Sequence, residues 1–250
     1  MDDKLRNLID EALNIFENRE VKSQIVTSSI PILFFGDYTL EPKVITVGLN
    51  PSRLEFPDNN RYQRFPLMEG WTRESFCYET YVESCCRYFD EQPYHWFQNY
   101  EEILKGLDAS FKLNGNNGTS IHTDICSPLA TEKSWRHLGT DTKQRLTLAG
   151  TPLWKSLVSY LHPKLIIAQV GLEHLKVLGP QQSWRTVPVP ETVLGTESEI
   201  MVLRKKLNSH ASTTVHWKPI RPSYTPFGDL TPKERFRLGQ FIRDRICSLN

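Results

Sequence analysis

The chain has 250 residues, with 30 Lys and Arg against 29 Asp and Glu, and its formal net charge is +1. This balance excludes the strong overall basicity that marks a protein held to nucleic acid by charge alone. The length allows a substantial core, and we expect a single domain over residues 1–250.

Strands and helices alternate along the predicted chain. In chain order we predict helix 4–20, strand 43–49, helices 75–89 and 99–110, strand 120–127, helix 151–162, strand 163–171, helix 172–179, strand 213–220 and helix 230–247. The alternation predicts an α/β fold, a three-layer sandwich with a central, largely parallel sheet.

Local signals add detail to these elements. Thr151 is the expected N-cap of helix 151–162, and Thr231 with Glu234 fits a capping box. The segment 180–200 is rich in Pro and Thr and is expected to be a loop with room for one short strand. The stretches LRKKL (203–207) and KERFRLGQFIRDR (233–245) are basic, and each fits a solvated helix face or a local nucleic-acid contact.

The five cysteines are odd in number and include no Cys-x-x-Cys pair, which argues against a disulfide framework, a zinc ribbon and a four-thiolate iron–sulfur cluster. The acidic, amphipathic N-terminus differs from a signal peptide, and no apolar run reaches transmembrane length. The histidines show no ligand-like spacing. We therefore expect a reduced, soluble, cytoplasmic monomer without a cofactor, a metal or a membrane partner.

Three predicted strands end in unusual residues: GLNPS (48–52), HTDICSPL (122–129) and KPIRPSYTPFG (218–228). Ligands of open α/β sheets bind outside the carboxyl ends of the strands. The three ends are therefore expected to converge in space and form the functional site.

In this order, the three ends resemble motifs of the uracil-DNA glycosylase superfamily over roughly residues 30 to 245. VGLNPS resembles the first motif of the branch with Asn at the catalytic position, and HTDICSPLAT resembles the middle, base-reading strand. HPKLIIAQVGLEHLKVL is similar to the family's helix–strand–glycine–helix passage, and IRPSYTPFG stands where the family has a His-Pro-Ser-Pro loop. The resemblance implies a uracil-DNA glycosylase-like fold, DNA as the partner, and hydrolysis of the glycosidic bond of a flipped base.

By this resemblance Asn50 is the catalytic residue that positions water behind the sugar carbon. Its amide orients a water without acting as a strong base, which suffices for a cationic sugar transition state. Gly48 allows close approach of the backbone to the base, and Pro51 fixes the turn. The alternative is that Asn50 and Pro51 only start a turn.

Asp124 stands where uracil-releasing relatives have Asn. An ionised aspartate presents only acceptors, so it repels uracil O4 and suits the exocyclic amine of cytosine. Its second oxygen faces cytosine N3, where a proton would satisfy the contact and improve the leaving group. We therefore expect a cytosine-type base; the alternative is an exposed or N-capping aspartate.

Ser52 replaces the bulky Tyr of uracil-specific relatives and would leave the site open toward C5 of the base, unless it is only a turn residue. A modified cytosine then becomes admissible, such as the glucosylated hydroxymethylcytosine that some superfamily members excise from phage DNA in antiviral defence. Phe65 is the expected stacking platform for the base, with Tyr62 and Phe56 as alternatives.

In the third loop, Arg221 occupies the place of the family's His, and its permanent charge suits the anion that forms at O2 of the departing base. His216 is the alternative to Arg221, and an ordinary surface ion pair is the simpler explanation for the arginine. Pro222 and Ser223 match the motif, and Ser223 is expected to hold a DNA phosphate. Tyr224 or Phe227 would wedge into the base stack.

Other functions remain open at this point. The same fold can act on uracil or another deaminated base, and the altered third motif also fits a non-catalytic nucleic-acid-binding module. A small-molecule nucleotide hydrolase is disfavoured because the sequence contains no glycine-rich phosphate loop.

Overall fold

The structure is a computed structural model of the chain, and it describes residues 1–18, 20–40, 44–111, 120–207, 210–217 and 225–247. The chain divides into two compact units, each made of three stretches. Unit 1 consists of Met1–Asp37, Gly48–Tyr94 and His122–Leu161, and unit 2 of Tyr38–Val47, His95–Ile121 and His162–Asn250. The residues that end the first two strands, among them Gly48 and Asp124, therefore belong to unit 1.

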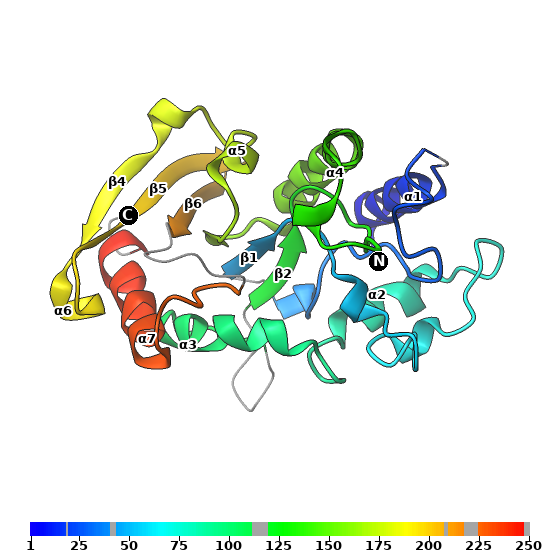
Figure 1. Ribbon diagram of the computed structural model, residues 1–250, viewed down its shortest axis with the longest axis horizontal. Helices are drawn as coiled ribbons and strands as arrows, with labels where there is room; N and C mark the ends of the chain where they lie inside the picture. The colour runs from blue at the N-terminus through cyan, green and yellow to red at the C-terminus, as the bar shows by residue number, and fades with distance from the viewer. Residues whose placement is uncertain (19, 41–43, 112–119, 208–209, 218–224, 248–250) are drawn as a thin grey trace. The chain divides into compact units, whose positions relative to one another are not determined.

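A six-stranded mixed sheet flanked by helices makes this an α/β protein (Figure 1). The strands are β1 (Val44–Gly48), β2 (Ser120–Asp124), β3 (Leu165–Ala168), β4 (Arg185–Val189), β5 (Ser198–Leu207) and β6 (His210–Trp217), in the spatial order β2-β1-β3-β6-β5-β4. β3 pairs in parallel with both β1 and β6, whereas β4, β5 and β6 are joined by antiparallel pairs. In the parallel part, Val47 lies opposite Ala168 and Ala168 opposite His216.

The parallel strands read as uninterrupted apolar runs because both of their faces are covered. All five residues of β1 and all four residues of β3 are buried. β-Branched side chains such as Val44 and Ile166 favour the extended backbone and fill this interior. β1 ends at Gly48, two residues before Asn50.

Seven α-helices lie in the described part of the chain: α1 (Asp3–Glu17), α2 (Tyr78–Cys86), α3 (Gln98–Gly106), α4 (Thr140–Leu161), α5 (Leu172–Leu175), α6 (Glu191–Leu194) and α7 (Pro232–Phe241), which continues as a π-helical segment, Ile242–Cys247. Asp2 caps α1 by accepting a hydrogen bond from the Leu5 amide at 2.9 Å. The capping box of α7, between Thr231 and Glu234, is confirmed.

The start of α4 differs from the prediction, because the helix begins at Thr140 and not at Thr151. The Thr151 hydroxyl donates to the carbonyl of Ile125 at 2.9 Å instead of capping a helix. The Trp154 indole donates to Thr123 Oγ1 at 3.0 Å. The middle of α4 therefore fastens the residues on either side of Asp124.

The region after β3 contains more strand than the sequence indicated. Segment 180–200 contains the one short strand that was allowed for, β4, but it also forms α6 and the start of β5 and is therefore not mainly a loop. The basic stretch 203–207 lies in β5 and not on a helix. The helix predicted over 172–179 is limited to Leu172–Leu175. In β4 and β5 the antiparallel backbone pairing outweighs the low strand preference of the local Pro and Lys residues.

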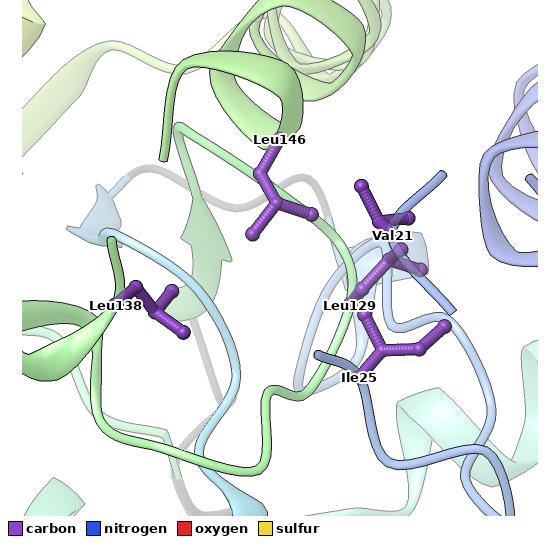
Figure 2. Packing of buried hydrophobic residues seen from close by; sticks show 5 residues of the cluster. All are labelled: Val21, Ile25, Leu129, Leu138 and Leu146. Carbon is purple, nitrogen blue, oxygen red and sulfur yellow. The ribbon is translucent and has the colours of Figure 1, made fainter. Parts of the chain in front are cut away.

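A small hydrophobic cluster in unit 1 lies beside the turn that follows β2. Figure 2 shows its five buried side chains, Val21, Ile25, Leu129, Leu138 and Leu146. Leu129 is fully buried in it, which fixes the backbone of residues 129–131. Bridges from Ile25 and from Ser52 to Thr131 hold the same segment.

In unit 2, α3 and α7 pack at two glycines. A Cβ on Gly106 would lie 2.2 Å from the Phe236 carbonyl oxygen, and a Cβ on Gly239 would lie 2.2 Å from the Ile103 carbonyl oxygen. Both close neighbours are backbone atoms, which cannot rotate away as a side chain can.

We predict that Gly106→Ala lowers the free energy of unfolding by about 1–3 kcal/mol, because the helices must separate. This cost exceeds the gain of about 1 kcal/mol that Ala brings to a helix. Gly139→Ala is the control, since nothing lies within 4 Å of a Cβ there. Urea unfolding of both variants measures the difference, and equal stabilities would contradict the packing described.

Candidate functional site

The carboxyl ends of β1 and β2 meet in unit 1. The Ile125 amide donates to the Gly48 carbonyl at 3.0 Å. A Cβ on Gly48 would lie 2.5 Å from Asp124 Oδ1 and 2.9 Å from His122 Nε2. Glycine is therefore required at residue 48 by the side chains of β2, and the first two predicted strand ends do converge.

The amide of Asn50 is held in one orientation. Its Nδ2 donates to the Pro51 carbonyl at 2.8 Å, to Thr131 Oγ1 at 2.9 Å and to the Leu129 carbonyl at 3.3 Å. These partners accept hydrogen bonds, so they fix the NH₂ group on their side. Oδ1 has no hydrogen bond to a described residue and can accept one from another molecule. The buried Leu129 (Figure 2) holds the backbone that sets this orientation.

Asp124 is a buried carboxylate without a hydrogen bond to any described residue. Its side chain is 3% exposed, and His122 Nε2 lies 3.6 Å from Oδ1, within ion-pair distance. His122 is also buried, with its side chain 2% exposed. The alternative of an exposed or N-capping aspartate is therefore wrong. A buried carboxylate normally has hydrogen-bond partners, so this one is suited to bind a ligand with N–H donors.

A second buried carboxyl group, Glu55, lies five residues after Asn50. Tyr88 Oη donates to Glu55 Oε2 at 2.5 Å, and Arg64 Nε lies 3.8 Å from the same oxygen. Burial raises the pKa of Glu55 to about 7, and the charge of Asp124 acts in the same direction. The Tyr88 hydrogen bond and the Arg64 charge oppose that shift.

The aromatic residues beside these groups form a buried stack. Phe65 and Phe56 are both fully buried, and their rings stack at 5.4 Å with an interplanar angle of 16°. Phe65 also contacts Phe35 and Tyr88. Neither Phe56 nor Phe65 presents an open ring face, so a base can stack on them only if a ring moves. Of the three predicted platforms, only Tyr62 is partly exposed.

Ser52 caps the short 3₁₀ helix Arg53–Glu55 by accepting a hydrogen bond from the Leu54 amide at 3.1 Å. This hydrogen bond is the turn role that the sequence left open. It also turns the chain so that Glu55 enters the interior. The small size of Ser52, on which the expected opening toward C5 rests, is compatible with this capping role.

Residues 218–224, most of the third predicted strand end (218–228), lie outside the described residues. This applies to the whole set Arg221, Pro222, Ser223 and Tyr224. His216, in unit 2, is buried, and its Nδ1 lies 3.1 Å from the Ala168 carbonyl oxygen. Burial lowers the pKa of His216, which favours the neutral ring with its proton on Nδ1.

Phe227 was predicted as a possible wedge into DNA, and this prediction is wrong. The residue is 1% exposed and its ring packs against Tyr100 and Trp217. Its backbone has a φ of 52°, in the left-handed region. Phe227 is part of the core of unit 2.

Several cations of the two basic stretches bind their own chain. Arg235 donates to the carbonyls of Phe227 and Leu230, and Arg204 donates to the carbonyl of Ile246. Within the described ranges, no three His, Cys, Asp or Glu side chains gather as a metal site would require. Among those residues there is also no helix with the length and apolar character needed to cross a membrane.

Comparison with models of protein families finds no match for the chain, and no curated protein is significantly similar to it. The resemblance to uracil-DNA glycosylases therefore rests on the sequence motifs alone.

Sequence reasoning missed two residues of this site, Glu55 and Thr131. Glu55 stands among turn-forming residues, RLEFPD, where a charged side chain is ordinarily solvated. The one sequence signal of its burial is the next residue, Phe56, because an aromatic neighbour is an apolar environment for a carboxylate. Thr131 lies far from Asn50 in the sequence, and only the bridge to Ser52 brings it close.

We predict a pH-dependent stability that is due to Glu55. Its pKa is raised from 4.5 to about 7 in the folded protein, so its contribution is complete below pH 4.5 and is lost as the pH rises to about 7. The loss amounts to about 3 kcal/mol. Glu55→Gln keeps an acceptor for Tyr88 and should remove this dependence.

Urea unfolding of wild type and Glu55→Gln across this pH range measures the difference in their free energies of unfolding. The contributions of the other titratable groups cancel in this difference. Glu69→Gln is the matched control, because Glu69 is exposed. Parallel curves for wild type and Glu55→Gln would contradict a raised pKa.

Proposed function

We propose that the protein is a monofunctional DNA glycosylase with a uracil-DNA glycosylase-like fold, which removes a flipped, C5-modified cytosine and leaves an abasic site. Glucosylated hydroxymethylcytosine of phage DNA is the modification that the resemblance favours. The observation that carries the proposal is the Asp124 carboxylate, which is buried beside Gly48 and has no hydrogen bond to a described residue.

Asp124 provides the base recognition. One carboxylate oxygen accepts a hydrogen bond from the exocyclic amine, a donor that uracil lacks at that position. The other oxygen pairs with N3 when that nitrogen is protonated. The protonated base leaves without developing a full negative charge, which lowers the barrier to cleavage.

Asn50 positions the attacking water molecule. Because Nδ2 is occupied by Pro51, Leu129 and Thr131, Oδ1 accepts from a water and directs its oxygen lone pair at the sugar carbon. The amide needs no proton transfer of its own, since the sugar is already cationic in the transition state. Its fixed orientation supplies positioning, an effect that is large for an immobilised reactant.

The sheet order supports a ligand at this place. In the order β2-β1-β3, the strand order reverses between β1 and β3. In open α/β sheets, ligands bind outside the carboxyl ends of the strands at such a reversal. β1, on one side of this reversal, ends at Gly48, and Leu49 and Asn50 follow it directly.

We predict that the protein frees a modified cytosine, and not uracil, from synthetic DNA. The test is mass spectrometry of bases released from DNA that contains uracil, cytosine, hydroxymethylcytosine or its glucoside. Asn50→Ala should bind the same DNA without releasing the base. Release of uracil alone would contradict the role of Asp124, and binding without any release by wild type would indicate a non-catalytic module.

We further predict that Asp124→Asn lowers release of the cytosine derivative by about 10- to 100-fold and raises release of uracil, because an amide offers both a donor and an acceptor. Asp90→Asn, at an exposed position, is the matched control. The ratio of the two rates is the measurement. An unchanged substrate spectrum in Asp124→Asn would place the base elsewhere.

A further inference from the structure

His122 and Asp124 lie on the same face of β2. They are two residues apart in a strand, where alternate side chains point to the same side. Thr123, between them, lies on the other face and accepts a hydrogen bond from the Trp154 indole. His122 Nε2 lies 3.6 Å from Asp124 Oδ1, and both side chains are buried. The strand itself therefore sets an imidazole beside the carboxylate.

The same two side chains also meet at the end of β1. A Cβ on Gly48 would lie 2.5 Å from Asp124 Oδ1 and 2.9 Å from His122 Nε2. These two atoms consequently lie at one point beside the Gly48 backbone. His122 is thus a direct neighbour of the carboxylate oxygen that the proposed base recognition uses.

His122 is held in this position by Phe35. The Phe35 amide donates to the His122 carbonyl at 2.9 Å, and the His122 amide donates to the Phe35 carbonyl at 3.0 Å. The rings of the two residues lie 5.7 Å apart, and the Phe35 ring packs edge-on against Tyr88 at 4.6 Å between centroids. Backbone pairing and ring packing therefore both restrict movement of the imidazole away from Asp124.

The charge state of Asp124 decides which base the site can reject. A protonated carboxyl group offers one donor and one acceptor, as the amide of Asn does. Its O–H can turn to N3 of cytosine or to O4 of uracil, so it reads both bases. An ionised carboxylate offers only acceptors and repels uracil O4. Selection against uracil therefore requires that Asp124 stay ionised.

An ionised Asp124 needs a partner of opposite character. Burial favours the neutral form of a carboxyl group, whereas a facing N–H donor or positive charge favours the ionised form. His122 is the one ion-pair partner of Asp124 among the described residues. The charge of Asp124 also interacts with Glu55, but Glu55 has the same sign and cannot stabilise it. The partner required for ionisation is therefore His122.

We propose that His122 is the specificity-determining partner of Asp124: its Nε2–H keeps the carboxylate ionised and oriented, so the site accepts an amino-bearing pyrimidine and rejects an oxo-bearing one. This inference rests on the proposed function, because it names the group that sets the base preference of the same site. The distance of 3.6 Å is longer than a hydrogen bond, so the attraction is electrostatic and the carboxylate keeps its lone pairs for the base. His122 acts through Asp124 and is a positioning residue.

Base release by His122→Phe tests this role on synthetic DNA that contains uracil or glucosylated hydroxymethylcytosine. The variant keeps an aromatic ring against Phe35 but has no N–H for Asp124. Its ratio of uracil release to release of the cytosine derivative should rise about tenfold over wild type. Partial unfolding lowers both rates and leaves their ratio unchanged, so a purely structural role would not produce this result.

Two further variants complete the test. His122→Gln keeps a side-chain N–H donor and should restore a ratio close to that of wild type. His137→Phe is the matched control, because His137 is exposed, and it should behave as wild type. The same ratio in His122→Phe and in wild type would overturn the proposal.

A second measurement does not depend on DNA. Nitrogen-15 NMR of histidine-labelled protein at neutral pH should show a proton on His122 Nε2, assigned by its loss in His122→Phe. This signal should move in Asp124→Asn and stay in place in the exposed control Asp90→Asn. If Nε2 carries no proton, or if Asp124→Asn leaves the signal unchanged, the proposal is refuted whatever the substrate. If the spectra are as expected but wild type releases no base from either DNA, the proposed function fails and the His122–Asp124 pair stands.

Discussion

The site depends on a buried carboxylate, Asp124, that receives no hydrogen bond from a described residue and pairs with His122. Removing an ionised carboxylate from water costs on the order of several kcal/mol, and most buried charges recover this through hydrogen bonds or ion pairs. Among the described residues Asp124 has no hydrogen bond, and its one ion-pair partner there is His122, whose Nε2 lies 3.6 Å from Oδ1. The surrounding structure must hold this side chain in place, and a donor from a bound molecule would lower its free energy.

Unit 1 supplies that support from several directions. The helix α4 binds Thr123 and Ile125 on either side of Asp124, and Gly48 leaves room for the carboxylate. The hydrophobic cluster around Leu129 fixes the chain that orients Asn50. The polar groups are therefore set by packing on rigid elements, which is the condition for a preorganised site.

The two carboxyl groups have different environments and hence different chemistry. Glu55 is enclosed by aromatic rings and has its pKa raised toward neutrality, with Tyr88 and Arg64 in position to stabilise its charged form. Asp124 faces Gly48, whose missing side chain leaves room for the carboxylate itself. Pairs of titratable groups with contrasting environments commonly divide the acid and charge-binding roles of an active site.

The sequence by itself determined the alternation of strands and helices, the buried strand that ends at Gly48, and the meeting of that end with Asp124, because these follow from local apolar runs and from the rule for parallel sheets. It did not determine the antiparallel extension of β4 and β5, since pairing with β6 outweighs the loop-like content of residues 180–200. It also did not reveal the burial of Glu55, the enclosure of Phe65 or the contact of Asn50 with Thr131. Each of these depends on residues distant in the chain, and burial and hydrogen bonding are decided only when those residues pack together.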